Sequence, residues 1–217
     1  MVNSLSIADL RAKYELDQAT ALILEKYLFD PANFDFHANR IKLDGFDQAK
    51  NYLKRVTYVP EKKDLEQMPS RDSHEYAQLK KIGEEAFLDG EVLVVVLAGG
   101  MATRFGGGIK ALAPILSGLS FAKVKQLDLE KYALKHNVTC KLLFMTSFLS
   151  DESMSRWAAS NSNDYVKIGT CPQSISLRLR TDGQIFREDN GDVSFYSPGH
   201  GDLLEVLSRS KDFEQFY

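Results

Sequence analysis

Hydrophobic side chains recur at helical spacings through the first 88 residues. In the stretch 6–29, leucine, alanine and tyrosine side chains lie mostly three or four positions apart, which is typical of an amphipathic helix. Pro31 and Pro60 interrupt the pattern, and residues 58–71 read as an exposed connector before a further helix over 73–87. We therefore expect a helical N-terminal region. It either buttresses the sheet that follows or serves regulation or association.

The pattern changes at Gly90. Residues 91–98 are short, continuously apolar and rich in valine, as expected of a parallel strand buried on both faces. A helix is expected over 121–136, and a second apolar strand over 139–146 completes a βαβ unit. The residues expected to form the buried face of that helix are Phe121, Val124, Leu127 or Leu129, and Ala133.

A second strand–helix–strand repeat follows. Ser150, with two acidic residues after it, marks the start of a helix over 151–159, and a third strand is expected over 165–168. This alternation predicts an α/β fold built on a doubly wound, mostly parallel sheet.

From residue 175 onward, turn signals replace helical spacings. Asp182-Gly183 and Asn190-Gly191 are tight-turn dipeptides between short apolar segments, so we expect a β-hairpin insertion. The expected strands cover 176–180, 184–188 and 193–196, and a last helix is expected over 202–216.

A glycine-rich loop follows the first strand, at the end of the strand where open α/β sheets bind ligands. Five glycines fall within residues 99–108, and they let backbone N–H groups approach an anion closely. Arg104 and Lys110 add positive charge. The loop matches neither the Walker pattern nor Gly-x-Gly-x-x-Gly. It is either a phosphate cradle or a flexible linker with two solvated cations.

Composition narrows the class of protein. With 44% hydrophobic and 26% charged residues, the chain has the composition of an ordinary globular protein. A net charge of -3 without a basic block argues against nucleic acid as a partner. We find no leader sequence and no apolar run of about 18 residues, which a membrane span needs. Because Cys140 and Cys171 lack metal-type spacing, we expect a cytoplasmic protein.

Several motifs, taken in order, resemble those of sugar nucleotidyltransferases. Residues 97–110 resemble the signature Gly-Gly-x-Gly-Thr-Arg…Lys, and residues 121–126 resemble the family's Phe-Leu-Asp-Leu-Lys segment. Met145-Thr-Ser-Phe and Gln173-Ser…Arg178 resemble two further motifs. Pro198-Gly-His-Gly-Asp202 resembles the loop of eukaryotic-type UTP-sugar-1-phosphate uridylyltransferases, which include UDP-glucose and UDP-sugar pyrophosphorylases. The resemblance covers about residues 90–210.

The resemblance implies a reaction and a site. The reaction is transfer of UMP from UTP to a sugar 1-phosphate, giving a UDP-sugar and pyrophosphate, with Mg²⁺ as cofactor. Arg104 and Lys110 would stabilise the departing pyrophosphate. Gln173 would read the pyrimidine edge, because its amide both donates and accepts. The full set of expected nucleotide-binding residues is Ala98, Gly99, Gly100, Lys125, Gln173, Gly199, His200 and Gly201.

The resemblance also implies an incomplete Rossmann-like nucleotidyltransferase fold. We expect a helical region over 1–88 and the nucleotide-binding half of a catalytic domain over 89–217. The family's metal-binding aspartate lies in an Asn-x-Asp segment that would fall beyond Tyr217, so a C-terminal half would be lost by truncation or supplied by another chain.

Other interpretations stay open. The protein is alternatively an N-acetylhexosamine-1-phosphate uridylyltransferase, or a non-catalytic module that binds uridine nucleotides. The second alternative draws on Ala102, which stands where the family has glycine. Lys125 is either a site residue or a solvated surface charge. Asp202 is expected to cap the following helix rather than bind a metal.

Overall fold

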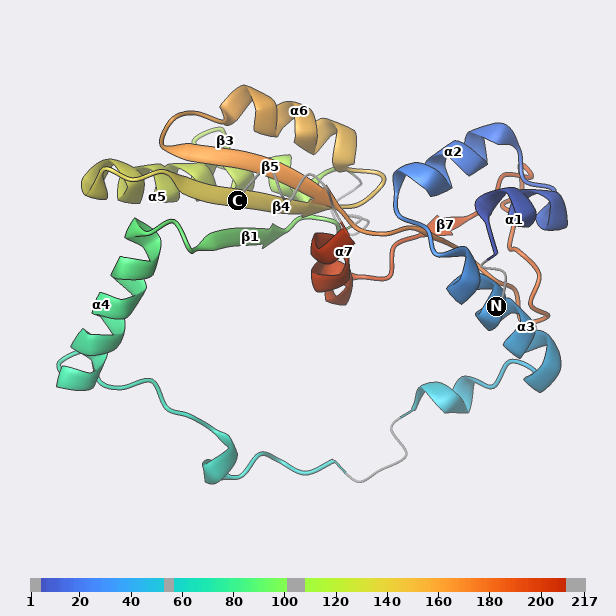
Figure 1. Cartoon of the computed structure of the whole chain (residues 1–217), viewed down its shortest axis with the longest axis horizontal. Coiled ribbons are helices and arrows are strands. Elements are labelled where there is room, and N and C mark those ends of the chain that lie inside the picture. Colours follow the sequence, from blue (N-terminus) through green and yellow to red (C-terminus); the bar gives the residue numbers. More distant parts are fainter. Residues whose placement is uncertain (1–4, 53–56, 101–107, 210–217) are drawn as a thin grey trace.

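The computed structural model describes residues 5–52, 57–100 and 108–209 (Figure 1). Its α-helices are α1 (Ile7–Tyr14), α2 (Gln18–Lys26), α3 (Pro31–Asp44), α4 (His74–Leu88), α5 (Phe121–His136), α6 (Asp151–Asn161) and α7 (Leu203–Arg209). Its strands are β1 (Leu93–Leu97), β2 (Pro114–Leu116), β3 (Leu119–Ser120), β4 (Cys140–Thr146), β5 (Val166–Pro172), β6 (Ser176–Leu177) and β7 (Phe195–Tyr196). The short 3₁₀ turns include η4 (Lys110–Leu112) and η5 (His200–Asp202).

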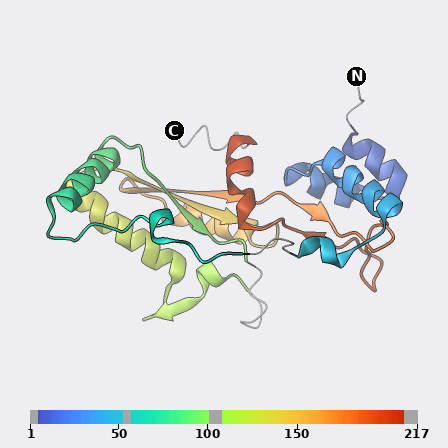
Figure 2. The same cartoon turned by 90° about the horizontal axis from the view of Figure 1, so that it is seen from below.

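A parallel sheet with the strand order β1-β4-β5 forms the centre of the fold. On one face, Leu142 and Phe144 of β4 pack with Met154 of α6 and with part of α5. On the other face, Leu143 packs with Val206 of α7. Figure 2 shows α7 and α5 on opposite sides of the strands. Helices therefore cover both faces of a parallel sheet, which confirms the predicted α/β fold.

Helix α5 begins and ends at the expected residues but buries a partly different face. The Ser120 hydroxyl accepts a hydrogen bond from the Lys123 N–H and caps the helix. The expected apolar face was wrong at Phe121, Val124 and Leu127, which are exposed. Ala133 is buried as expected and Leu129 packs against the core, but Ala122 and Gln126 are the other buried residues. Alanine side chains let the helix lie close to the strands, and the Gln126 amide donates to the Asn161 carbonyl oxygen, 2.8 Å away.

The N-terminal region is helical, but its breaks fall at other positions than expected. Residues 6–29 form two helices rather than one, because Glu15 adopts a left-handed conformation and ends α1. Pro31 starts α3 instead of interrupting a helix, and the Asp30 carboxylate accepts from the Asn33 N–H. A proline at the first helical position loses no hydrogen bond. The helix expected over 73–87 is confirmed as α4.

Helices α1 to α3 pack against the β-hairpin insertion. Gly183 and Gly191 take positive φ angles at the two predicted turns, and β6 pairs with β7 in an antiparallel ladder. The shared core contains the buried side chains Leu10, Leu24, Phe34, Ile175, Leu177, Ile185 and Val193. Residues on both sides of position 88 thus form one hydrophobic core, beside the sheet in Figure 1.

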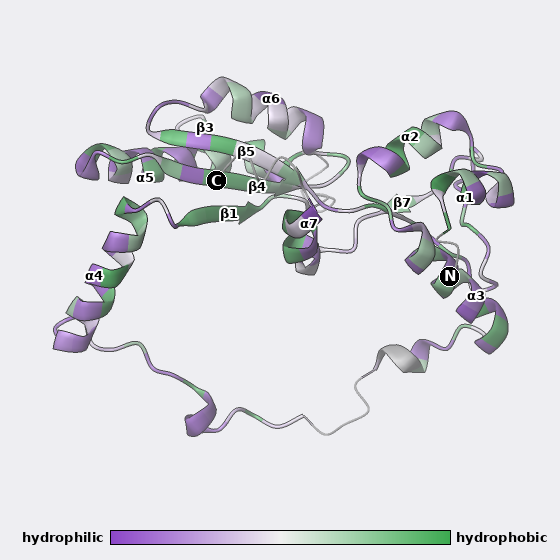
Figure 3. Cartoon of the chain, in the orientation of Figure 1, coloured by the Kyte–Doolittle hydropathy of each residue, from purple (hydrophilic) through white to green (hydrophobic). Residues whose placement is uncertain are grey.

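Hydropathy follows this arrangement. Strand β1 is hydrophobic along its length, whereas α4 alternates between hydrophilic and hydrophobic residues (Figure 3). No helix within the described ranges has both the length and the apolar character needed to cross a bilayer.

Candidate functional site

The ends of the three parallel strands meet at one pocket of about 390 Å³. Gly99 and Gly100 follow β1, Ser147 follows β4, and Gln173 follows β5. The complete lining is Gly99, Gly100, Ser147, Phe148, Gln173, Arg178, Tyr196, Ser197, Gly199 and His200. The pocket lies at the carboxyl edge of the sheet, where α/β folds bind ligands. The structure therefore brings together five of the residues expected from separate motifs: Gly99, Gly100, Gln173, Gly199 and His200.

Gly99 and Gln173 are in close contact. A β-carbon at Gly99 would lie 2.2 Å from Gln173 Nε2 and 3.0 Å from the Thr146 carbonyl oxygen, so any larger residue here would have to displace the Gln173 amide or the loop. The Gln173 N–H donates to that same carbonyl oxygen at 2.9 Å, and the residue is only 2% exposed. Its backbone is thus hydrogen-bonded to the end of β4, and its side-chain amide lies buried against the first residue of the glycine loop.

The turn at Gly199 forms another wall of the pocket. Gly199 has a φ of 110°, which a side chain would strain, and η5 follows it directly. Asp202, expected to cap the next helix, instead accepts two hydrogen bonds from Ser174. The Asp202 carboxylate lies 2.7 Å from the Ser174 backbone nitrogen and 2.7 Å from its hydroxyl oxygen. This contact joins the Gly-His-Gly turn to the residue after Gln173.

The sequence interpretation missed five lining residues as site residues: Ser147, Phe148, Arg178, Tyr196 and Ser197. Two signals pointed toward them, because Ser147 and Phe148 belong to the Met-x-Ser-Phe motif and Arg178 to the motif that begins at Gln173. The Arg178 guanidinium lies 5.9 Å from the centroid of the Tyr196 ring, a cation–π distance. The Ser197 hydroxyl is buried and has no hydrogen-bond partner among the described atoms.

The expected cationic residues lie elsewhere or outside the described ranges. Lys110 is exposed on η4, Lys125 is exposed on α5, and neither lines the pocket. Arg104 falls outside the described residues. Ala98 continues the ladder of β1, since its N–H donates to the Met145 carbonyl oxygen at 2.7 Å. Gly201 is exposed within η5 and is absent from the lining.

A buried carboxylate supports the strand end that carries Ser147. Asp151 Oδ1 accepts from the Thr146 hydroxyl at 3.0 Å, and Asp151 Oδ2 accepts from the Tyr27 hydroxyl at 3.5 Å. Lys26 Nζ lies 3.9 Å from the same carboxylate. Helix α2 is therefore tied to the carboxyl end of β4.

The ligand expected for Mg²⁺ belongs to a segment beyond residue 217. Across the described ranges, no three His, Cys, Asp or Glu side chains gather closely enough to hold a metal ion. The Mg²⁺ cofactor therefore stays a prediction.

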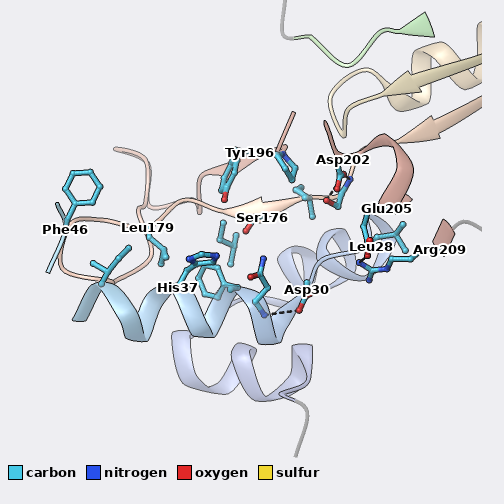
Figure 4. A pocket seen from close by; sticks show the side chains of 17 residues that line it. Leu28, Asp30, His37, Phe46, Ser176, Leu179, Tyr196, Asp202, Glu205 and Arg209 are labelled. Atoms are coloured by element: carbon cyan, nitrogen blue, oxygen red, sulfur yellow. Dashed lines mark hydrogen bonds and ion pairs between the residues drawn. The ribbon is translucent and has the colours of Figure 1, made fainter. Parts of the chain in front are cut away.

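A larger cavity, of about 760 Å³, lies beside the pocket (Figure 4). Its walls come from α3, from the segment 174–179 and from α7. Tyr196 lines both cavities, and Asp202 lines the larger one.

Comparison with protein families gives a match over most of the chain. A family model described as UTP–glucose-1-phosphate uridylyltransferase matches residues 43–217. A UTP–glucose-1-phosphate uridylyltransferase of Hordeum vulgare is 28% identical over 130 residues, which are 58% of this chain and 27% of that protein. A probable UDP-N-acetylglucosamine pyrophosphorylase of Encephalitozoon cuniculi is 28% identical over 132 residues, or 60% of this chain and 38% of that protein. The chain thus spans well under half the length of these relatives.

Solved structures share the fold. The uridine diphosphate N-acetylglucosamine pyrophosphorylase of Trypanosoma brucei, in complex with an inhibitor, superposes with a TM-score of 0.56. That comparison covers 95% of this chain and 46% of the other, at 18% identity. A putative UDP-N-acetylglucosamine pyrophosphorylase of Entamoeba histolytica gives a TM-score of 0.53 at 20% identity, over 63% of this chain and 37% of that one.

Proposed function

Because the chain belongs to the UTP–glucose-1-phosphate uridylyltransferase family, we propose that it carries the uridine-binding part of an enzyme that transfers UMP from UTP to a sugar 1-phosphate. The products are a UDP-sugar and pyrophosphate. The residues 89–217 form the nucleotide-binding half of the catalytic domain in this proposal. In this proposal, the C-terminal half of the catalytic domain either follows in a longer form of the same chain or is supplied by another chain.

One observation carries the proposal. A single pocket at the carboxyl edge of the sheet joins Gly99 of the glycine loop, the buried amide of Gln173, and Gly199 of the Gly-His-Gly turn. These residues come from three motifs that are far apart in the sequence. Their convergence supports a site for one ligand. Polar groups of the site would contact the base of that ligand, and backbone N–H groups of the loop would contact its phosphates.

The chemistry of the walls suits uracil. The side-chain amide of Gln173 offers a donor and an acceptor, which match a carbonyl oxygen and an N–H on the edge of uracil. Gly199 and His200 line the same space, where their backbone groups are proposed to contact the base. Because the Gln173 amide alone fits uracil or, turned over, cytosine, discrimination against cytosine in this proposal requires that amide to be held in one orientation together with the backbone groups of the Gly199–Gly201 turn.

The transfer itself is an in-line displacement. A phosphate oxygen of the sugar 1-phosphate attacks the α-phosphorus of UTP, a new P–O bond forms, and the bond from the α-phosphorus to the bridging oxygen breaks. Pyrophosphate leaves with that electron pair. Catalysis of such transfers rests mainly on positioning and on charge stabilisation. Arg104 and Lys110 are the proposed groups that offset the charge on pyrophosphate.

A second candidate is an N-acetylhexosamine-1-phosphate uridylyltransferase. The relative from Encephalitozoon cuniculi, named a probable UDP-N-acetylglucosamine pyrophosphorylase, favours it. Incubation of the protein with UTP and either glucose 1-phosphate or N-acetylglucosamine 1-phosphate separates the two by the pyrophosphate released. Binding of UTP without release for either sugar supports the third alternative, a non-catalytic module.

Calorimetric titration with UTP, CTP and ATP tests the proposal. We expect UTP to bind at least about tenfold more tightly than CTP, because one mismatched buried hydrogen bond costs about 1–3 kcal/mol. The Gln173→Leu variant should lose this preference. Equal affinity for UTP and CTP in the unaltered protein would contradict the proposed function.

A further inference from the structure

We propose that Asp202 is a positioning residue whose carboxylate holds the Gly199–Gly201 turn against Gln173, and that this contact makes the pocket selective for uracil. The inference rests on the proposed function and deepens it. Asp202 does not line the pocket itself, so it acts through the residues that do.

The contact is short and joins two motifs. Asp202 Oδ2 accepts from the Ser174 N–H and from the Ser174 hydroxyl, both at 2.7 Å, across 28 positions of sequence. Hydrogen bonds to a charged acceptor are about twice as strong as those between neutral groups. One carboxylate oxygen thus connects the Gly-His-Gly-Asp segment to the segment that carries Gln173.

The Ser174 side of the contact is anchored independently. The N–H of Gln173 donates to the Thr146 carbonyl oxygen, and the N–H of Ile175 donates to the Tyr27 carbonyl oxygen, both at 2.9 Å. These bonds fix the backbone on either side of Ser174 to β4 and to the end of α2. Loss of the Asp202 carboxylate therefore leaves Gln173 in place.

The turn itself has less support. Inside it, the N–H of Asp202 donates to the Gly199 carbonyl oxygen at 3.2 Å, and two of the three residues 199–201 are glycines. Glycine has more backbone freedom than any other residue. Helix α7 is held after the turn by Val206, which is 1% exposed. The Asp202 contact thus constrains the most adaptable wall of the pocket.

Selectivity depends on that constraint. Uracil and cytosine have the same shape and differ in the donor and acceptor pattern of one edge, so discrimination requires partners held to within about 0.5 Å. A turn released from Ser174 can move to accept either base. We expect the loss of Asp202 to lower UTP affinity and, more specifically, the preference for UTP over CTP.

Glu205 provides a matched control. It lies one helical turn later, carries the same charge, and pairs with Arg209 at 3.6 Å. Figure 4 shows Asp202, Glu205 and Arg209 at the same end of the larger cavity. Removal of Glu205 changes the charge near the turn without touching the contact to Ser174.

The experiment measures dissociation constants for UTP and CTP in the whole chain and in the variants Asp202→Ala, Asp202→Asn, Ser174→Ala and Glu205→Ala. For Asp202→Ala we expect UTP affinity to fall at least about tenfold, as befits two hydrogen bonds to a carboxylate. The ratio of CTP to UTP dissociation constants should approach one. Asp202→Asn and Ser174→Ala should give smaller losses of the same ratio, and Glu205→Ala should leave it unchanged.

A second readout separates positioning from general stability. Hydrogen exchange of the backbone amides should become faster at residues 199–203 in Asp202→Ala, while the backbone N–H of Gln173 keeps its protection. A preserved UTP preference in Asp202→Ala overturns this inference alone, and so does a Glu205→Ala variant that loses the preference equally. No preference in the unaltered protein overturns the proposed function and this inference together. Should Asp202→Ala not fold, Ser174→Ala and Asp202→Asn decide the question by the same ratio.

Discussion

The two sides of the candidate nucleotide site differ in how firmly the chain builds them. On the base side, Gln173 is buried, its backbone is bonded to β4, and Ser174 is bonded to Asp202. On the proposed phosphate side, Lys110 is exposed and lies outside the pocket lining. In the proposed function, the group that reads the base is therefore part of the buried structure, whereas Lys110, one of the groups proposed to contact phosphate, is a long surface side chain.

This difference predicts which substitutions should have large effects on stability and binding. A change in the sheet core or at the base wall disturbs packed neighbours and so has a large effect. A change at an exposed lysine removes a charge that water already screens, so the effect is small.

The largest effect is expected from the sheet core that supports the base wall. Phe144 of β4 is 0% exposed and packs with Trp157 in an edge-to-face pair. Phe144→Ala should lower the free energy of unfolding by about 3–5 kcal/mol, as measured by urea titration followed by circular dichroism. Leu134→Ala on α5, where the side chain is 55% exposed, is the control and should cost under about 1 kcal/mol. Similar losses of stability for both variants would contradict the assignment of Phe144 to the core and of Leu134 to the surface.

The next effect is expected at the contact between the glycine loop and Gln173. In Gly99→Ala the new β-carbon meets Gln173 Nε2 and the Thr146 carbonyl oxygen, so either the amide or the loop must move. We expect a stability loss of about 1–3 kcal/mol and a UTP affinity at least about tenfold weaker. Thermal unfolding and calorimetric titration measure the two effects.

Gly100→Ala is the matched control for this prediction. A β-carbon at Gly100 meets no described atom within 4 Å. The variant should therefore keep the thermal stability of the unaltered protein. If Gly100→Ala and Gly99→Ala were equally impaired, the loop would be intolerant of side chains in general, and the specific role of the Gln173 contact would be lost.

The smallest effect is expected on the phosphate side. Lys110→Ala should weaken UTP binding about two- to fivefold, as expected for one exposed charge pair, and should leave uridine binding unchanged. Titration with UTP and with uridine checks this difference. Lys125→Ala removes the same charge from the exposed face of α5 and should change neither affinity. Equal weakening of UTP and uridine by Lys110→Ala would refute a phosphate contact.

Much of the fold was predictable because its signals are local. The valine run of β1 and the turn dipeptides at Gly183 and Gly191 each depend on neighbouring residues, and the structure confirms the strand and both turns. Strand β1 is, however, half-buried along most of its length rather than buried on both faces. Apolar spacing predicted the buried face of α5 only in part, at Leu129 and Ala133. Alanines and Gln126 face the strands there, because close approach and the hydrogen bond to Asn161 outweigh side-chain hydrophobicity.

The site shows the same division. Gly99, Gln173 and Gly199 could be identified from motifs, since each is fixed by a local backbone requirement or by its chemistry. The contact between Asp202 and Ser174 spans 28 positions and leaves no periodic signal in the sequence. Tyr196 and Ser197 reach the pocket only because β7 pairs with β6 and returns the chain to the sheet. Long-range contacts of this kind need the folded chain.

The most direct test of the central claim is a nuclear magnetic resonance titration of the isotope-labelled chain with UTP. If the pocket holds uracil, the largest shifts should appear at the Gln173 side-chain amide and at the backbone amides of Gly99 and Gly199, and uridine alone should reproduce the shift at Gln173. Shifts confined to residues outside the pocket lining, with the Gln173 amide unchanged at saturation, would contradict the account.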